Sequence, residues 1–425
     1  MRANSTGRLA ILLASLLPLA AQAQVQAIGQ QDLVSSTPGL ADVNPDVLTF
    51  QAGLGLEYHD NIFDLPNGVT PTEATYGGSG RSDTQIRGLF GVNFDKQVSL
   101  QRFQLFGQLE PVKFMEFDRF DHVAYDLGAN WDWAIGRPWF GTLGVRLTER
   151  LSGFDSVQIT DKNMEERNKF YATAGMRLTP DWAIVSGIDL ETARNSASAL
   201  DYYDYDFLSY ELGARYTRGR QSEFEFVWRH TDGDYPNRQV LDSAGNVLPS
   251  SVDNEFSQDS LLLRLQYRPS NDSRIAGHVG YTTRDYDTQS DRDFSGVVAG
   301  LDLDWSPTGA FQMRTSLIHE IQPEELLTAN HVTSTSLVLR PLFQLTGRTA
   351  LEGLAQYTKR DYDGEPTVGA GTRKDDVTIV GLDAIYAYSR TITGRAGVQY
   401  VKRDSNISQF DFDDTRITLS VVANF

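Results

Sequence analysis

Apolar side chains recur at every second position in most of the chain from residue 47 to the C-terminus, in runs of about ten to fifteen residues separated by short breaks. Successive side chains of a strand point to opposite faces, so a period of two predicts β-strands. We predict 18 strands, at residues 47–60, 82–95, 101–117, 120–133, 138–152, 168–178, 181–193, 203–217, 221–232, 255–267, 272–287, 293–305, 310–321, 332–345, 348–361, 375–388, 391–404 and 412–425.

The breaks between these runs alternate in length. Short turns such as Gly136-Arg137-Pro138 and Thr346-Gly347 follow even-numbered strands, whereas longer Gly- and Asp-containing segments such as 61–81 and 233–254 mostly follow odd-numbered ones. Short turns at one rim and long loops at the other are typical of outer-membrane barrels, with the short turns in the periplasm and the long loops outside the cell.

A stack of soluble β-sandwiches is the competing interpretation of the same alternation. Sandwich strands average five or six residues, whereas these runs reach the roughly 9 to 11 residues that cross a bilayer at a tilt. Five of the six tryptophans also lie beside short turns, as an interfacial aromatic girdle requires: Trp131, Trp133, Trp139, Trp182 and Trp305. We therefore predict an all-β fold, a transmembrane antiparallel β-barrel of about 18 strands.

The N-terminus carries an export signal. Arg2 and Arg8 precede an apolar run over residues 9–20, and Ala21-Gln22-Ala23 fits an A-x-A cleavage site. The predicted organisation is a signal peptide over 1–23, a short flexible periplasmic leader over 24–46 and a barrel over 47–425. The predicted location is the outer membrane of a Gram-negative cell, after cleavage near Ala23.

Composition excludes several classes of function. The 425 residues include no cysteine, which rules out cysteine-based metal or thiol sites, and the net charge of −18 argues against nucleic-acid binding. None of the six histidines has metal-ligand spacing, so we predict no metal and no cofactor. His278 and Ser316 are expected to face the lumen, but nothing in their spacing makes them catalytic partners. We predict that the protein is not an enzyme.

The face opposite the apolar one is rich in charged residues, and in a barrel this face lines the lumen. Arginine and carboxylate side chains interleave on it in near balance, which predicts a wide aqueous channel. Singly, these charges are interpreted as cross-strand ion pairs; as a set, the arginines would attract carboxylates, phosphates or sulfates of a solute. The predicted transport path comprises Arg87, Arg146, Arg177, Arg215, Arg229, Arg264, Arg268, Arg274, Arg314, Arg340, Arg395, Arg416, Glu211, Glu225, Asp302 and Glu352.

Acidic clusters occur in the segments between strands, particularly at 201–206 and 411–414. Neither has the Gly and Glu of an EF-hand loop, so a solvated rim is the preferred interpretation. Binding of divalent cations together with lipopolysaccharide is the alternative.

Two sets of residues resemble a known family. The segment Tyr58-His59-Asp60-Asn61-Ile62-Phe63 is similar to the Y-x-D-N-(I/V)-F segment of EpsL-type exopolysaccharide-operon outer-membrane proteins, a branch of a β-barrel porin family. The strand ends Arg284-Asp285-Tyr286-Asp287, Arg360-Asp361-Tyr362-Asp363 and Arg403-Asp404-Ser405 resemble that family's strand ends. The terminal Phe425 resembles the signal that the barrel-assembly machinery recognises.

The resemblance implies a channel that exports an exopolysaccharide. The expected partners are outer-membrane lipid and lipopolysaccharide, the polysaccharide, the barrel-assembly machinery and periplasmic export proteins. The alternative is a general or substrate-selective diffusion porin for small polar solutes, in which loops such as 233–254 fold inward and limit solute size.

Overall fold

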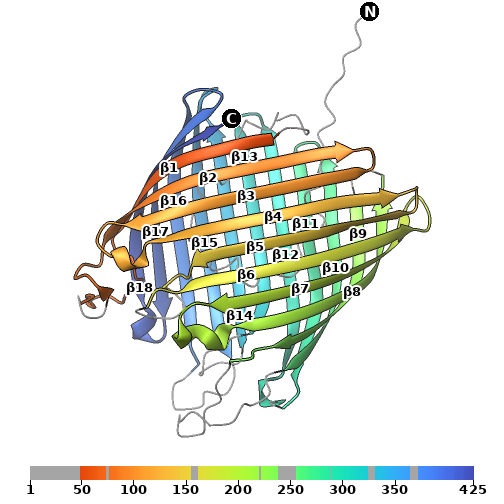
Figure 1. Ribbon diagram of the computed structural model, residues 1–425, viewed down its shortest axis with the longest axis horizontal. Coiled ribbons are helices and arrows are strands. Elements are labelled where there is room, and N and C mark those ends of the chain that lie inside the picture. Colours follow the sequence, from red (N-terminus) through yellow and green to blue (C-terminus); the bar gives the residue numbers. More distant parts are fainter. Residues whose placement is uncertain are drawn as a thin grey trace, which may run out of the picture.

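The computed structural model describes residues 48–72, 76–154, 161–219, 222–237, 255–288, 290–323, 331–363 and 372–425. They form one 18-stranded antiparallel sheet (Figure 1). The strands are β1 (Leu48–His59), β2 (Asp83–Val98), β3 (Gln101–Phe114), β4 (His122–Ile135), β5 (Trp139–Leu151), β6 (Met164–Arg177), β7 (Trp182–Asn195), β8 (Tyr205–Arg218), β9 (Ser222–Asp234), β10 (Phe256–Ser270), β11 (Ser273–Tyr286), β12 (Phe294–Thr308), β13 (Phe311–Pro323), β14 (His331–Gln344), β15 (Thr349–Asp363), β16 (Lys374–Ala387), β17 (Ile392–Ser405) and β18 (Phe412–Asn424).

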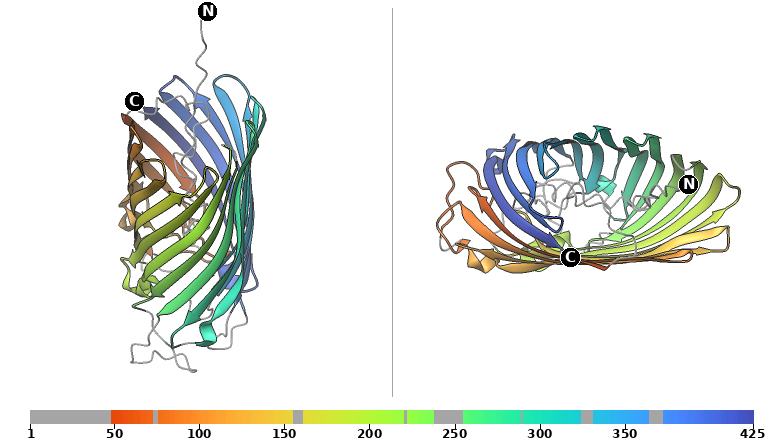
Figure 2. Two further views of the ribbon diagram at one scale, coloured as in Figure 1. Left: turned by 90° about the vertical axis from the view of Figure 1, so that its right-hand side faces the viewer. Right: turned by 90° about the horizontal axis from the view of Figure 1, so that it is seen from above.

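The sheet closes on itself. Each strand pairs with the next along the chain, and β18 pairs with β1 over nine residue pairs, from Gln51 opposite Asn424 to His59 opposite Arg416. Strands β2–β8 form one side of the wall and β11–β17 the other, and the barrel is flattened when seen from above (Figure 2). Closure removes the unpaired edge that a sheet of this size would otherwise expose. The predicted fold class and strand number are confirmed.

The two rims differ as predicted. The short turns that follow even-numbered strands lie at the rim that holds the C-terminus, where the Asn424 amide bonds the carbonyl of Thr391 in the turn before β17. The longer connections occupy the other rim, and several of them contain a short 3₁₀ helix: Asp118–Phe120, Ser198–Tyr203, Ser290–Arg292 and Ser408–Phe410. No helix of the described residues is long and apolar enough to cross a membrane. The predicted signal peptide and leader lie outside the described residues.

Strand ends are where prediction and structure differ most. Strand β6 begins at Met164, four residues before the predicted start. The sequence Glu165-Glu166-Arg167 shows no apolar alternation, yet its charges divide between the two faces: Glu165 pairs with Arg167, and Glu166 accepts a hydrogen bond from Asn168 at 2.7 Å. The ladder continues through this polar segment because backbone pairing with β5 does not depend on side-chain hydropathy.

The outer face is apolar over the middle of the strands and aromatic near the short turns. Leu54, Leu212 and Leu419 are more than half exposed on it, as expected for side chains that lipid would cover. The strand register places the five predicted girdle tryptophans on this face.

Replacing Leu419 with arginine tests which face contacts lipid. Leu419 lies on the outer face in the middle of β18. Leu419→Arg is therefore expected to destabilise the barrel, lowering its free energy of unfolding in vesicles by about 2–4 kcal/mol. The matched variant Thr418→Arg puts the same group on the inner face, beside the Asp383 carboxylate, and is expected to cost much less. Urea titration in phospholipid vesicles measures both. Equal losses would contradict the assignment of the faces.

Candidate functional site

The strand register brings all sixteen predicted path residues to the inner face. On each strand they alternate with outward-facing neighbours, as Arg264 does with Leu263 and Leu265. Antiparallel pairing then places charges of adjacent strands opposite one another, for example Arg264 opposite Glu225 and Arg215 opposite Glu225 from the other side. The inner wall is therefore the candidate functional surface.

A first group of charges joins β1, β2 and β3. The Arg87 guanidinium lies between two carboxylates, with Nη1 2.6 Å from Glu57 and Nη2 2.5 Å from Glu110. All three side chains are about nine-tenths buried. Hydrogen-bonded pairing of this kind is what allows charges to be buried. The group holds three strands in register, which is a structural role.

A second group closes the seam between β1 and β18. His59 lies 3.1 Å from Glu57 and 2.9 Å from the fully buried Asp414, which also accepts a 2.6 Å bond from Arg416. Just beyond the end of β1, partial burial raises the pKa of the Asp60 carboxyl. The sequence analysis assigned the 411–414 cluster to a solvated rim, and for Asp414 this was wrong, because Asp414 lies within β18 on its inner face, where it contacts His59 and Arg416.

A third group spans β6 to β10. Arg229 bonds Asp189 at 3.0 Å and Glu211 at 2.8 Å, and Arg264 approaches the same Glu211 at 2.7 Å. Lys169 extends the group to Glu191 at 2.9 Å. Its members are mostly buried, so this network is also primarily structural.

The remaining predicted residues have local partners. Arg215 lies 2.6 Å from Glu225, Arg146 lies 2.6 Å from Asp126, and Arg395 bridges Glu352 and Asp383. Arg177 donates to the Arg137 carbonyl at 3.1 Å and stacks on Phe140 at 4.4 Å, and Asp302 accepts a 2.5 Å bond from Ser316. Arg268, Arg274, Arg314 and Arg340 lie together on β10, β11, β13 and β14.

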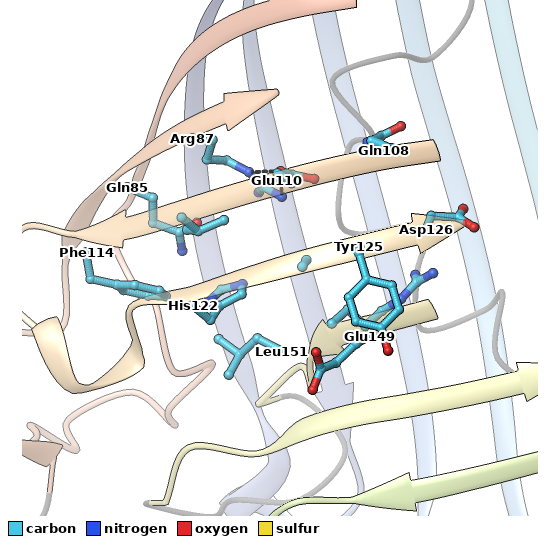
Figure 3. A pocket seen from close by; sticks show the side chains of 13 residues that line it. Gln85, Arg87, Gln108, Glu110, Phe114, His122, Tyr125, Asp126, Glu149 and Leu151 are labelled. Atoms are coloured by element: carbon cyan, nitrogen blue, oxygen red, sulfur yellow. Dashed lines mark hydrogen bonds and ion pairs between the residues drawn. The ribbon is translucent and has the colours of Figure 1, made fainter. Parts of the chain in front are cut away.

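A cavity of about 180 Å³ lies beside the first group, lined by residues of β2 to β5. Figure 3 shows Arg87 and Glu110 on one side of it, His122 and Phe114 toward one end, and Asp126 toward the other. Acidic and basic groups both line it, so it is a polar hollow without a strong preference for either sign of charge.

The inner wall also carries apolar patches that the sequence analysis missed. Val227, Leu262 and Val298 form a buried cluster across β9, β10 and β12. The polar networks of the inner wall are therefore interrupted by small apolar patches. Periodicity could not show this cluster, because each of the three strands supplies only one apolar residue to it, among polar residues of the same face.

The repeated Arg-Asp strand ends are structural. Arg284 is 1% exposed, and its guanidinium lies 3.6 Å from the centre of the Phe256 ring. Arg403 likewise lies 4.6 Å from the Phe412 ring. Stacking on aromatic faces favours a planar cation. These residues stabilise the loop-bearing rim.

No catalytic arrangement is seen in the described residues. Ser316 bonds Asp302, and His278 lies over Gly300 without a hydrogen-bond partner for Nε2, so the two are not linked. In the same part of the chain no three His, Asp or Glu side chains gather in a way that could hold a metal ion. In the other acidic cluster, Asp204 is 5% exposed and accepts bonds from Asn195 at 2.8 and 3.0 Å, so the solvated-rim interpretation was wrong for this residue as well.

Comparison with known proteins finds one family match and several similar solved structures. Residues 276–425 match the family described as "Putative beta-barrel porin 2". Among solved structures, the chain is similar to OccAB3 of Acinetobacter baumannii (9% identity, 89% of this chain and 99% of that chain, TM-score 0.46). It is also similar to the outer membrane protein opdK of Pseudomonas aeruginosa (11%, 89% and 99%, 0.45) and to the siderophore receptor PirA of the same organism (10%, 90% and 81%, 0.41). Comparison with curated protein sequences finds no match.

The last third of the chain is thus similar to a family of β-barrel porins, and the strands before residue 276 continue the same closed wall. Short turns and the C-terminus at one rim, long connections at the other and an apolar outer face define the architecture of an outer-membrane barrel.

Proposed function

We propose that the protein is a non-enzymatic outer-membrane channel that exports an exopolysaccharide through the barrel. The observation that carries the proposal is the contrast between the two faces of one closed sheet: the outer face is apolar, and the inner face bears ionisable groups contributed by neighbouring strands around the wall. A wall of that kind suits a hydrated, polar solute. The resemblance of Tyr58-His59-Asp60-Asn61-Ile62-Phe63 to exopolysaccharide-operon proteins supports the choice of polymer.

The proposal extends to partners. After cleavage near Ala23, the chain is inserted by the barrel-assembly machinery, which reads the C-terminal strand ending at Phe425. Periplasmic export proteins deliver the polymer, and lipopolysaccharide surrounds the loop-bearing rim.

A diffusion porin is the second candidate, because the family matched by residues 276–425 is described as a porin family. Such a porin would pass small polar solutes in either direction and would need no dedicated delivery proteins.

An in-frame deletion separates the two candidates. Polysaccharide is quantified in the medium and in the periplasm of the deletion strain, and the same strain carrying the wild-type gene serves as the control. Export predicts that polysaccharide is lost from the medium and accumulates in the periplasm. Unchanged secretion together with slower uptake of small polar solutes would reject export and favour the porin.

A further inference from the structure

Five inner-face residues at one level of β10 to β14 form what we call the arginine row: Arg268, Arg274, Asp304, Arg314 and Arg340. The register places Arg274 opposite Asp304, Asp304 opposite Arg314, and Arg314 opposite Arg340. Arg268 follows Tyr267, the partner of Ile275, and so lies beside Arg274. Four cations and one carboxylate therefore occupy adjacent positions on one stretch of wall.

The row departs from the charge balance of the inner wall. Its single carboxylate, Asp304, is shared by Arg314 at 3.0 Å and Arg274 at 3.7 Å. Within the described part of the chain, Arg268 and Arg340 have no carboxylate within 4 Å. Of the other eight predicted path arginines, seven have a carboxylate that close, and Arg177 is the exception among the described residues.

The row is open to solute. The Arg314 side chain is 58% exposed, and that of Arg274 is 31% exposed, whereas Arg229 and Arg87 in the structural groups are 8% and 11% exposed. A guanidinium with free donors binds carboxylate, sulfate or phosphate oxygens in a planar, two-point geometry. Neighbouring strands lie about 4.8 Å apart, so the row spans about 19 Å of wall. One polymer could therefore place several anionic groups on it.

The row lies near the short-turn rim. Each member is within four residues of the short-turn end of its strand, and Arg274 is the second residue of β11. In outer-membrane barrels this rim faces the periplasm. An exported chain would meet the row on its way in, before it reaches the balanced middle of the wall.

We propose that the arginine row is an anion-binding surface at the periplasmic mouth and that the exported polymer is acidic. The second part rests on the proposed export function; the first part does not. A single contact between a partly exposed arginine and one anionic group is weak. A polymer with repeated charges is therefore held by several such contacts and can still move along the wall.

The test compares two variants that lose the same charge at the same rim. The row variant carries Arg268→Gln, Arg314→Gln and Arg340→Gln. The control carries Arg218→Gln, Arg348→Gln and Arg390→Gln, which are exposed residues at or next to short turns. Correct assembly of both is checked by heat-modifiable mobility on gels.

Binding of oligogalacturonate to the purified, detergent-folded barrels is measured by titration calorimetry, with neutral dextran as the uncharged probe. The wild type and the control variant are expected to bind oligogalacturonate, and the row variant about tenfold more weakly, because three charges that each contribute to a shared contact are removed. Dextran is expected to show no difference. Equal oligogalacturonate binding by the row variant, or no binding by the wild type, would overturn the proposal.

Reversal potentials in planar bilayers under a KCl gradient give an independent readout. The anion-to-cation permeability ratio is expected to fall about fivefold in the row variant and to stay unchanged in the control. Loss of export in the deletion strain with unaltered binding by the row variant would reject the row alone. Normal secretion by the deletion strain, together with impaired binding by the row variant, would reject export but would still support the anion-binding surface.

Discussion

Replacing Arg87 with methionine is expected to destabilise the folded barrel by about 3–5 kcal/mol, because the change leaves the buried Glu110 carboxylate without its cation and the buried Glu57 carboxylate with only His59 beside it. Glu57 is 6% exposed and Glu110 is 9% exposed, and each lies within 2.6 Å of the Arg87 guanidinium. Water cannot replace that cation at so little exposed surface. Urea unfolding in phospholipid vesicles, followed by tryptophan fluorescence, measures the loss.

Two further variants identify the cause. Adding Glu57→Gln and Glu110→Gln to the methionine variant removes both carboxylate charges that Arg87 had neutralised and is expected to recover most of the stability. Arg340→Met removes an inner-face arginine without a carboxylate partner in the described residues, and is expected to change stability by less than about 1 kcal/mol. If Arg87→Met and Arg340→Met behaved alike, the distinction between paired and unpaired arginines would have no energetic basis.

This contrast divides the charged wall by function. Arginines held between buried carboxylates fix the strand register and have few donors left for a solute. The exposed arginines of the row, such as Arg314, and those without a carboxylate within 4 Å in the described residues, Arg268 and Arg340, are the ones that can act on what passes through. A mutational scan of the lumen that ignored this difference would confuse loss of folding with loss of transport.

The fold is predictable from the sequence to an unusual degree, for a physical reason. A lipid-facing barrel needs every strand to alternate over its full length, so each strand carries its own signal without help from tertiary contacts. All 18 strands and the order of short and long connections follow from that signal. The start of β6 does not, because Glu165 and Arg167 satisfy each other on the inner face and leave no apolar pattern to detect.

The candidate site is predictable only in part. Alternation assigns both Arg87 and Arg340 to the inner face, which is why they look equivalent in the sequence. Their difference lies in the partners: Arg87 meets Glu57 and Glu110 of adjacent strands, whereas Arg340 meets Arg314. Partners depend on register between strands, and a shift of one residue reverses every face. The seam contact of His59 with Asp414 joins residues 355 positions apart, which no local pattern indicates.

Replacing Asn61 with alanine is expected to open the loop-side end of the seam between β1 and β18, at a cost of roughly 3–5 kcal/mol. Asn61 is 2% exposed; its Nδ2 donates to the Leu65 and Asp413 carbonyls, both at 2.9 Å, and its Oδ1 accepts from the Leu65 amide at 3.0 Å. Each buried polar group left without its partner costs about 1–3 kcal/mol. The bonds to Leu65 hold the turn that follows β1, and the bond to Asp413 shows that Asn61 also joins the first strand to the last.

Hydrogen exchange resolved along the chain measures this opening. Amides at the loop-side ends of β1 and β18 are expected to exchange faster in Asn61→Ala, while those of β6 and β7, on another part of the wall, keep their wild-type rates. Asn406→Ala is the matched control: Asn406 donates to the Thr372 carbonyl at 2.8 Å and accepts from the Lys374 amide at 2.7 Å, but its bonds are exposed and water can replace them. Unchanged exchange at the seam of Asn61→Ala would mean that the barrel is closed by the backbone ladder alone, and that the Asp-Asn pair serves only the turn.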